Sequence, residues 1–110
     1  MLAVLLGAFG AHGLTGSLAP AMLAVYQTGV QYHFYHALGL LAVGILLLQF
    51  PCSVWLKWCG WLMFSGIMLF SGSLYLLAIT GERWLGMITP IGGIAFILSW
   101  LSMFIAILRT

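Results

Sequence analysis

Residues 84–108 read WLGMITPIGGIAFILSWLSMFIAIL, an apolar stretch of 25 residues without a charged side chain. An α-helix needs about 20 mostly apolar residues to cross a hydrocarbon core of ~30 Å. A helix also satisfies its own backbone hydrogen bonds, which lipid cannot do. This stretch therefore predicts a membrane-spanning helix.

The rest of the chain has the same character. Its 110 residues are 65% hydrophobic and 4% charged, with a mean hydropathy of +1.23. A water-facing globule of this composition would be insoluble. We therefore predict an all-α integral membrane protein, a bundle of about four helices that forms one domain over residues 1–110. Its long spans are expected at about 33–50, where Pro51 stops the helix, and at 55–79 and 84–108.

The N-terminal segment is apolar but short. Residues 1–11 cover about half of the length that a crossing requires. No Lys or Arg precedes this stretch, which argues against a cleaved secretory signal. We predict a short or truncated first span over about 1–14. Either the start methionine is assigned too late or the helix inserts only partly.

The few charges predict an orientation. Lys57 precedes the second long span and Arg109 follows the third, whereas Glu82 and Arg83 lie between these spans. The positive-inside rule favours a cytoplasmic location for Lys57 and Arg109. The tryptophans near the span ends are interpreted as interfacial anchors: Trp55, Trp58, Trp61 and Trp84.

Polar residues recur at helical spacing before residue 37. Gln27 and Gln31 are four apart, and His33 and His36 are three apart. We interpret this stretch as an interfacial amphipathic helix that bends into the first long span. In a second reading His33 and His36 meet His12 at a site for a metal, haem or proton; in a third, the histidines hydrogen-bond between helices. Since Glu82 is the only acid, no carboxylate near these residues completes a metal shell, and we predict no metal or cofactor.

Small residues indicate where the helices are expected to pack against each other. Apolar helices in lipid associate through close backbone packing, which small side chains allow. Pro90 also predicts a kink within the last span. The residues expected at packing positions are Gly7, Gly10, Gly13, Gly66, Ser71, Gly72, Ser73, Pro90, Gly92 and Gly93.

Four ordered blocks carry a family resemblance. They are GAFGAHGL at 7–14, YQTG at 26–29 with HAL at 36–38, LFSGSLY at 69–75, and TPIGG at 89–93 with Trp100. The blocks resemble those of the YgdD/YwdK-like family of small inner-membrane proteins, defined by domain of unknown function 423. The resemblance implies four spans, a multi-pass place in a bacterial inner membrane and no established activity. The family pattern has further apolar residues before the first block, which supports a truncated first span. His12 and His36 fall within blocks, whereas the match does not clearly reach His33.

The sequence excludes several classes of function. It contains no Walker loop, nucleophile elbow or HExxH motif, so we do not expect an enzyme. Its three scattered Lys and Arg residues form no nucleic-acid surface. We predict a structural or accessory subunit that packs, within the lipid bilayer, in a larger membrane complex or a homo-oligomer. The alternative is a small-solute or proton transporter or channel that works as an oligomer.

Overall fold

The computed structural model describes residues 1–13 and 20–109, with only the backbone described for His12 and Gly13. The described residues form helices and no strand. The elements are α1 (Leu2–Gly13), α2 (Pro20–Gln49), α3 (Val54–Gly66), η1 (Ile67–Ser71), α4 (Gly72–Thr80), η2 (Arg83–Met87) and α5 (Thr89–Leu108). The π-helix η1 joins α3 to α4, and the 3-10 helix η2 precedes α5.

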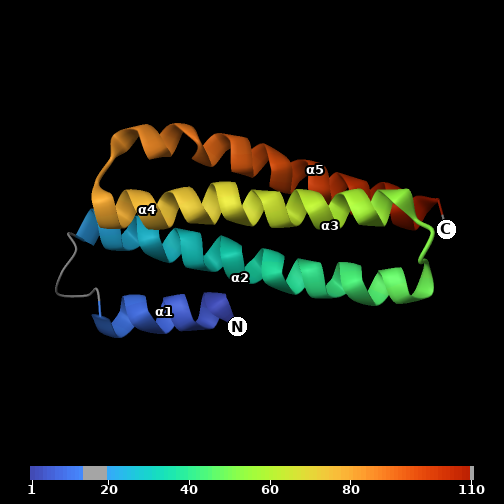
Figure 1. Ribbon diagram of the computed structural model, residues 1–110, viewed down its shortest axis with the longest axis horizontal. Coiled ribbons are helices and arrows are strands. Elements are labelled where there is room, and N and C mark those ends of the chain that lie inside the picture. Colours follow the sequence, from blue (N-terminus) through green and yellow to red (C-terminus); the bar gives the residue numbers. More distant parts are fainter. Residues whose placement is uncertain (14–19, 110) are drawn as a thin grey trace.

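These helices form an elongated bundle of 49 × 26 × 14 Å. Figure 1 shows α2, the continuous α3–α4 rod and α5 running side by side along the long axis. Three segments are long and apolar enough to cross a membrane: Pro20–Gln49, Val54–Thr80 and Arg83–Leu108. The predicted all-α membrane bundle is confirmed.

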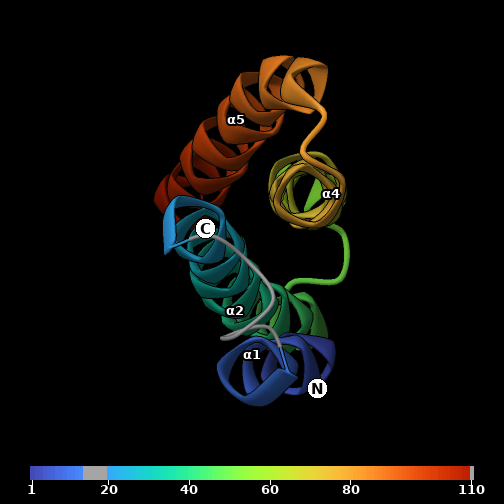
Figure 2. The same cartoon turned by 90° about the vertical axis from the view of Figure 1, so that its left-hand side faces the viewer.

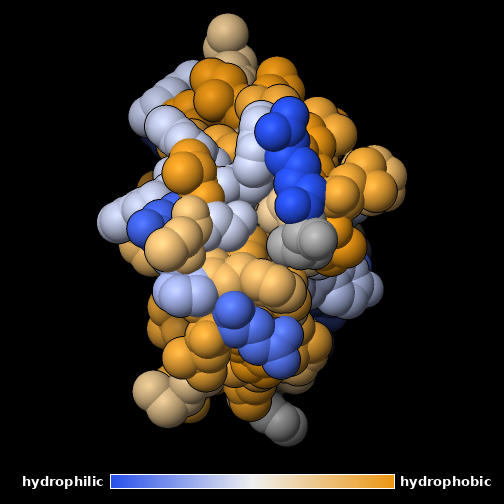
Figure 3. Space-filling view, turned by 90° about the vertical axis from the view of Figure 1, so that its right-hand side faces the viewer, coloured by the Kyte–Doolittle hydropathy of each residue, from blue (hydrophilic) through white to orange (hydrophobic). Residues whose placement is uncertain are grey.

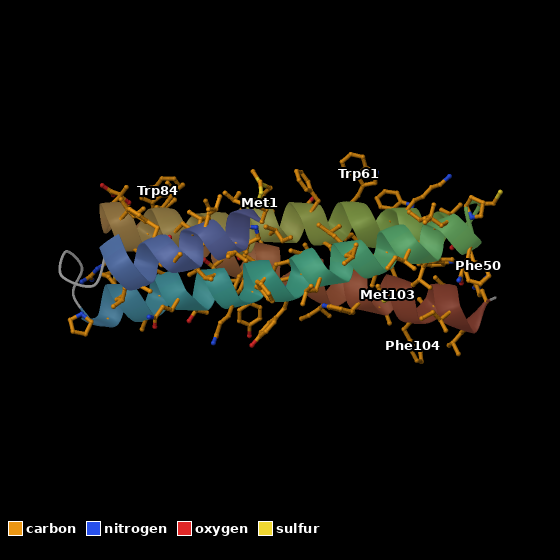
Figure 4. The ribbon with its side chains drawn as sticks, turned by 90° about the horizontal axis from the view of Figure 1, so that it is seen from below. Met1, Phe50, Trp61, Trp84, Met103 and Phe104 are labelled. Atoms are coloured by element: carbon orange, nitrogen blue, oxygen red, sulfur yellow. The ribbon has the colours of Figure 1, made fainter. Side chains whose placement is uncertain are left out.

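The first helix is much shorter than the others. With 12 residues, α1 is about 18 Å long, well below the ~30 Å of a hydrocarbon core. Met1 lies near the middle of the bundle's length (Figure 4), so α1 runs beside one half of α2. In the end-on view of Figure 2, α1 lies at the outer edge of the bundle, next to α2.

The interfacial helix expected to bend into the first long span is not a distinct element of the structure. The chain is one continuous helix from Pro20 to Gln49. Pro20 occupies its first turn, where the missing N–H costs nothing, and no further proline interrupts it before Pro51. Several polar residues that suggested an interface instead face other helices, as described below.

The two ends of the bundle carry different charges. The α2–α3 connection and the C-terminal end of α5 lie together at one end, as Figure 1 shows. The guanidinium of Arg109 lies 5.8 Å from the ring centroid of Trp55 there. Figure 3 looks onto this end, where hydrophilic patches stand among hydrophobic residues. Glu82 and Arg83 follow α4, which ends at the opposite end of the bundle.

The connection between α4 and α5 contains a turn and a short 3-10 helix. Gly81 ends α4 in the left-handed region with φ 74°, which glycine adopts without strain. The chain then forms η2, and α5 begins at Thr89 with Pro90 in its first turn. The kink predicted within the last span, about one turn before Pro90, coincides with the change from η2 to α5 at Ile88, and the proline lies in the first turn of α5.

Candidate functional site

One face of α2 is buried along most of its length. Its buried residues recur at spacings of three and four: Tyr26, Gly29, His33, His36, Gly39 and Val43. Such spacing places them on one stripe of a helix. Both histidines fall near the midpoint of Pro20–Gln49, so they lie near the middle of the bundle and, for a centred bundle, at mid-depth in the membrane.

His36 has a partner at each ring nitrogen. Its Nδ1 lies 2.8 Å from the carbonyl oxygen of Tyr32, and its Nε2 lies 2.9 Å from Nε1 of Trp100. A carbonyl only accepts and an indole N–H only donates. The imidazole is therefore neutral, with its proton on Nδ1 and its Nε2 accepting from Trp100. The ring stacks on Phe96 with centroids 3.5 Å apart. His36 thus ties α2 to α5.

His33 faces a different helix. Its Nδ1 lies 2.9 Å from the hydroxyl oxygen of Tyr75 on α4. The Tyr75 ring also packs against Tyr26, with centroids 5.2 Å apart. Tyr26 in turn donates its hydroxyl hydrogen to the carbonyl of Leu6 at 2.6 Å. These contacts connect α1, α2 and α4.

Two serines add further ties. The fully buried Ser71 donates from Oγ to the carbonyl of Gly29 at 2.7 Å. The hydroxyls of Ser73 and Thr89 are 2.6 Å apart and join α4 to α5. Over the described chain, every buried side-chain nitrogen and oxygen has a hydrogen-bond partner. The polar interior is used for holding helices together.

The histidines do not form one ligand site. His33 and His36 point to different helices, and the Nε2 lone pair of His36 is occupied by Trp100. The described residues contain no group of three His, Cys, Asp or Glu side chains placed to hold a metal. The side chain of His12, which one reading of the sequence brings to the same site, lies outside the described residues.

The two glutamines of the predicted cluster lie elsewhere. Gln27 and Gln31 are exposed on α2. They border a groove of about 250 Å³ between α1 and α2, together with Gly7 and Gly10. The polar cluster predicted from the sequence therefore divides into an inner pair of histidines and an outer pair of glutamines.

The small residues predicted at packing positions include closely packed ones and open ones. A Cβ at Gly92 would overlap the backbone of Phe70, and one at Gly66 would overlap the ring of Phe96. Gly10 lies against the Tyr26 ring and Gly7 against Val30, whereas Gly93 has only ordinary contact with Phe70. Gly72 has nothing within 4 Å of an added Cβ, so the prediction of close packing inside the bundle is wrong there. Gly13 ends α1, and its packing lies outside the described residues.

Sequence reasoning missed two packing glycines. A Cβ at Gly29 would lie 3.0 Å from the Tyr75 ring, and one at Gly39 would lie 2.8 Å from the sulfur of Met63. The sequence pattern that could have identified them is the spacing of three and four residues that places both glycines on the same helix face as His33 and His36.

Comparisons with known proteins agree with this architecture. The family model described as "Protein of unknown function (DUF423)" matches residues 6–93. The chain is 53% identical over 109 residues to the UPF0382 membrane protein YwdK of Bacillus subtilis, covering 99% of this chain and 89% of that protein. It is 50% identical to a UPF0382 membrane protein of Staphylococcus epidermidis, covering 99% and 88%. No solved structure matches the chain. The chain belongs to the DUF423 family of membrane proteins.

Proposed function

We propose that this protein is a non-enzymatic structural or accessory subunit of a bacterial inner membrane, which packs in a larger membrane complex or in a homo-oligomer. The observation that carries the proposal is the use of the polar interior. His36 binds Trp100, His33 binds Tyr75, and Ser73 binds Thr89. A catalytic or transport site needs polar groups that remain available to a substrate, whereas these groups are bonded to each other.

The outer surface supports the same proposal. Membrane helices associate through small residues and through polar groups that hydrogen-bond across the interface. This chain leaves both kinds on its surface, since Gly72 has open space around it and Gln27 and Gln31 are exposed. These features favour packing against another membrane protein.

The proposal is tested by gentle solubilisation of the native membrane, separation on a native gel, and mass spectrometry of whatever migrates with the chain. We expect either a defined complex or an oligomer of this chain alone. A strictly monomeric protein in every mild detergent tried would overturn the proposal.

A further inference from the structure

The outer face of α2 carries three polar side chains in a row. Gln27, Gln31 and Tyr35 follow each other at intervals of four residues and are all exposed. None of them makes a hydrogen bond to another described residue. Thr28 beside them differs, because its hydroxyl donates to the carbonyl of Ala24 in the same helix. We call Gln27, Gln31 and Tyr35 the outer face of α2.

This face lies at membrane depth. The bundle is 49 Å long, so a centred hydrocarbon core of about 30 Å leaves roughly 10 Å at each end. At about 1.5 Å per residue, Gln31 lies about 16 Å and Tyr35 about 22 Å from the start of α2. Gln27 lies at the boundary by the same measure. Two of the three groups are therefore within the hydrocarbon layer.

Lipid tails leave these groups without partners. An amide or hydroxyl in hydrocarbon has nothing to bind, and a polar group without a hydrogen bond is costly there. The inner face of the same helix meets this requirement through Tyr75 and Trp100. The outer face therefore has hydrogen-bonding groups that no described residue satisfies.

We propose that the outer face of α2 binds a second copy of this chain, an inference that rests on the proposed function and names its partner. A side-chain amide both donates and accepts, so a glutamine is complementary to itself. Two copies inserted in the same orientation place Gln31 at the same depth, and a two-fold axis along the membrane normal brings the two side chains together. The face carries no charge that would require an opposite charge on a different partner.

The surroundings of the face fit such a contact. Phe34 and Leu38 lie between and beyond the polar residues on the same side of α2, with 41% and 54% of their surface exposed. They supply apolar area beside the amides. The 250 Å³ groove at Gly7 and Gly10 lies next to Gln27 and Gln31 and provides space for a side chain from the other copy.

Cysteine cross-linking in native membranes tests the proposal. Leu38→Cys, which keeps both glutamines, is compared with Ile97→Cys, an exposed position near the middle of the Arg83–Leu108 segment. Both variants are made in a Cys52→Ser background because Cys52 is exposed and Cys59 is buried. We expect a cross-linked dimer of this chain from Leu38→Cys and none from Ile97→Cys. Equal cross-linking at both positions, no cross-link, or a cross-link only to another protein would overturn the proposal.

A second measurement uses the intact cysteines. The double variant Gln27→Leu/Gln31→Leu should dimerise about tenfold more weakly than the parent chain in detergent, since interhelical hydrogen bonds in membranes have modest strength. Gln49→Leu removes an exposed amide at the end of α2 and should leave dimerisation unchanged. Unchanged dimerisation of the double variant contradicts the proposal.

The results separate the two proposals. A native complex with a different protein at this face supports the proposed function and overturns the second copy as partner. A monomer overturns both. A dimer that cross-links through Leu38→Cys supports both.

Discussion

The inner and outer faces of α2 carry similar polar side chains in opposite situations. On the inner face His33 and His36 each have a partner on another helix. On the outer face Gln27 and Gln31 have none within the described chain and are exposed. In a membrane, a polar side chain favours whatever contact supplies its hydrogen bond. The comparison teaches that the inner face holds the fold and that the outer face is available for assembly.

The largest effect should come from the closest contact on the packed side. Gly92→Ala places a Cβ into the backbone of Phe70, and we expect a loss of about 3 kcal/mol in the free energy of unfolding, as for overpacked cores. Titration with SDS in mixed micelles measures it. Gly72→Ala, with open space at its Cβ, is the matched control and should cost nothing. An equal loss in both variants would remove the distinction between packed and open glycines.

Loss of the hydrogen bond between His36 and Trp100 should have the next largest effect on the free energy of unfolding. His36→Phe keeps a ring to stack on Phe96 but leaves the Trp100 N–H without its acceptor, so unfolding should become about 2 kcal/mol easier. A double-mutant cycle with Trp100→Phe should give a coupling energy of about 1 kcal/mol. The same cycle with the exposed Trp84→Phe should be additive. If the His36 and Trp100 substitutions are additive, the hydrogen bond between them does not stabilise the inner face of α2, which contradicts this account.

Two tyrosines give the smallest and most direct contrast. Tyr75→Phe removes the hydroxyl that binds His33 and should cost about 0.6–1 kcal/mol of unfolding free energy. Tyr35→Phe removes an exposed hydroxyl of the outer face and should leave the stability of the monomer unchanged. Both values come from the same SDS titration in a detergent that keeps the protein monomeric. A larger loss for Tyr35→Phe than for Tyr75→Phe contradicts the assignment of the two faces.

The sequence predicts the helices better where polar residues are few. The expected spans 55–79 and 84–108 lie within one residue of the apolar segments Val54–Thr80 and Arg83–Leu108. The helix that contains the first long span begins at Pro20, 13 residues before the span's expected start at residue 33, because polar side chains at 20–32 suggested an interface. Tyr26 among them has its hydrogen-bond acceptor, the carbonyl of Leu6, on α1, and a local pattern does not contain such a partner.

Prediction of the site has the same limit, because a local pattern does not contain the partners on other helices. Composition alone identifies His33 and His36 as unusual, and helix-to-helix bonding was one of the readings it allowed. Their partners lie 42 and 64 residues away along the chain, so only the helix crossings decide which nitrogen meets which group. The glycines show this as well, since Gly72 and Gly92 both lie within apolar spans but only at Gly92 would an added Cβ meet a neighbouring backbone.

The central claim is that the histidines in the middle of α2 tie helices together. Nitrogen-15 NMR of the His36 ring in lipid bilayers at neutral pH tests it most directly, with His36→Phe to assign the signals. The two contacts of His36 predict a neutral ring with the proton on Nδ1 and a hydrogen-bonded, unprotonated Nε2. A proton on Nε2, or a ring protonated at both nitrogens, would contradict the tie to Trp100 and return His36 to the candidates for proton or ligand binding.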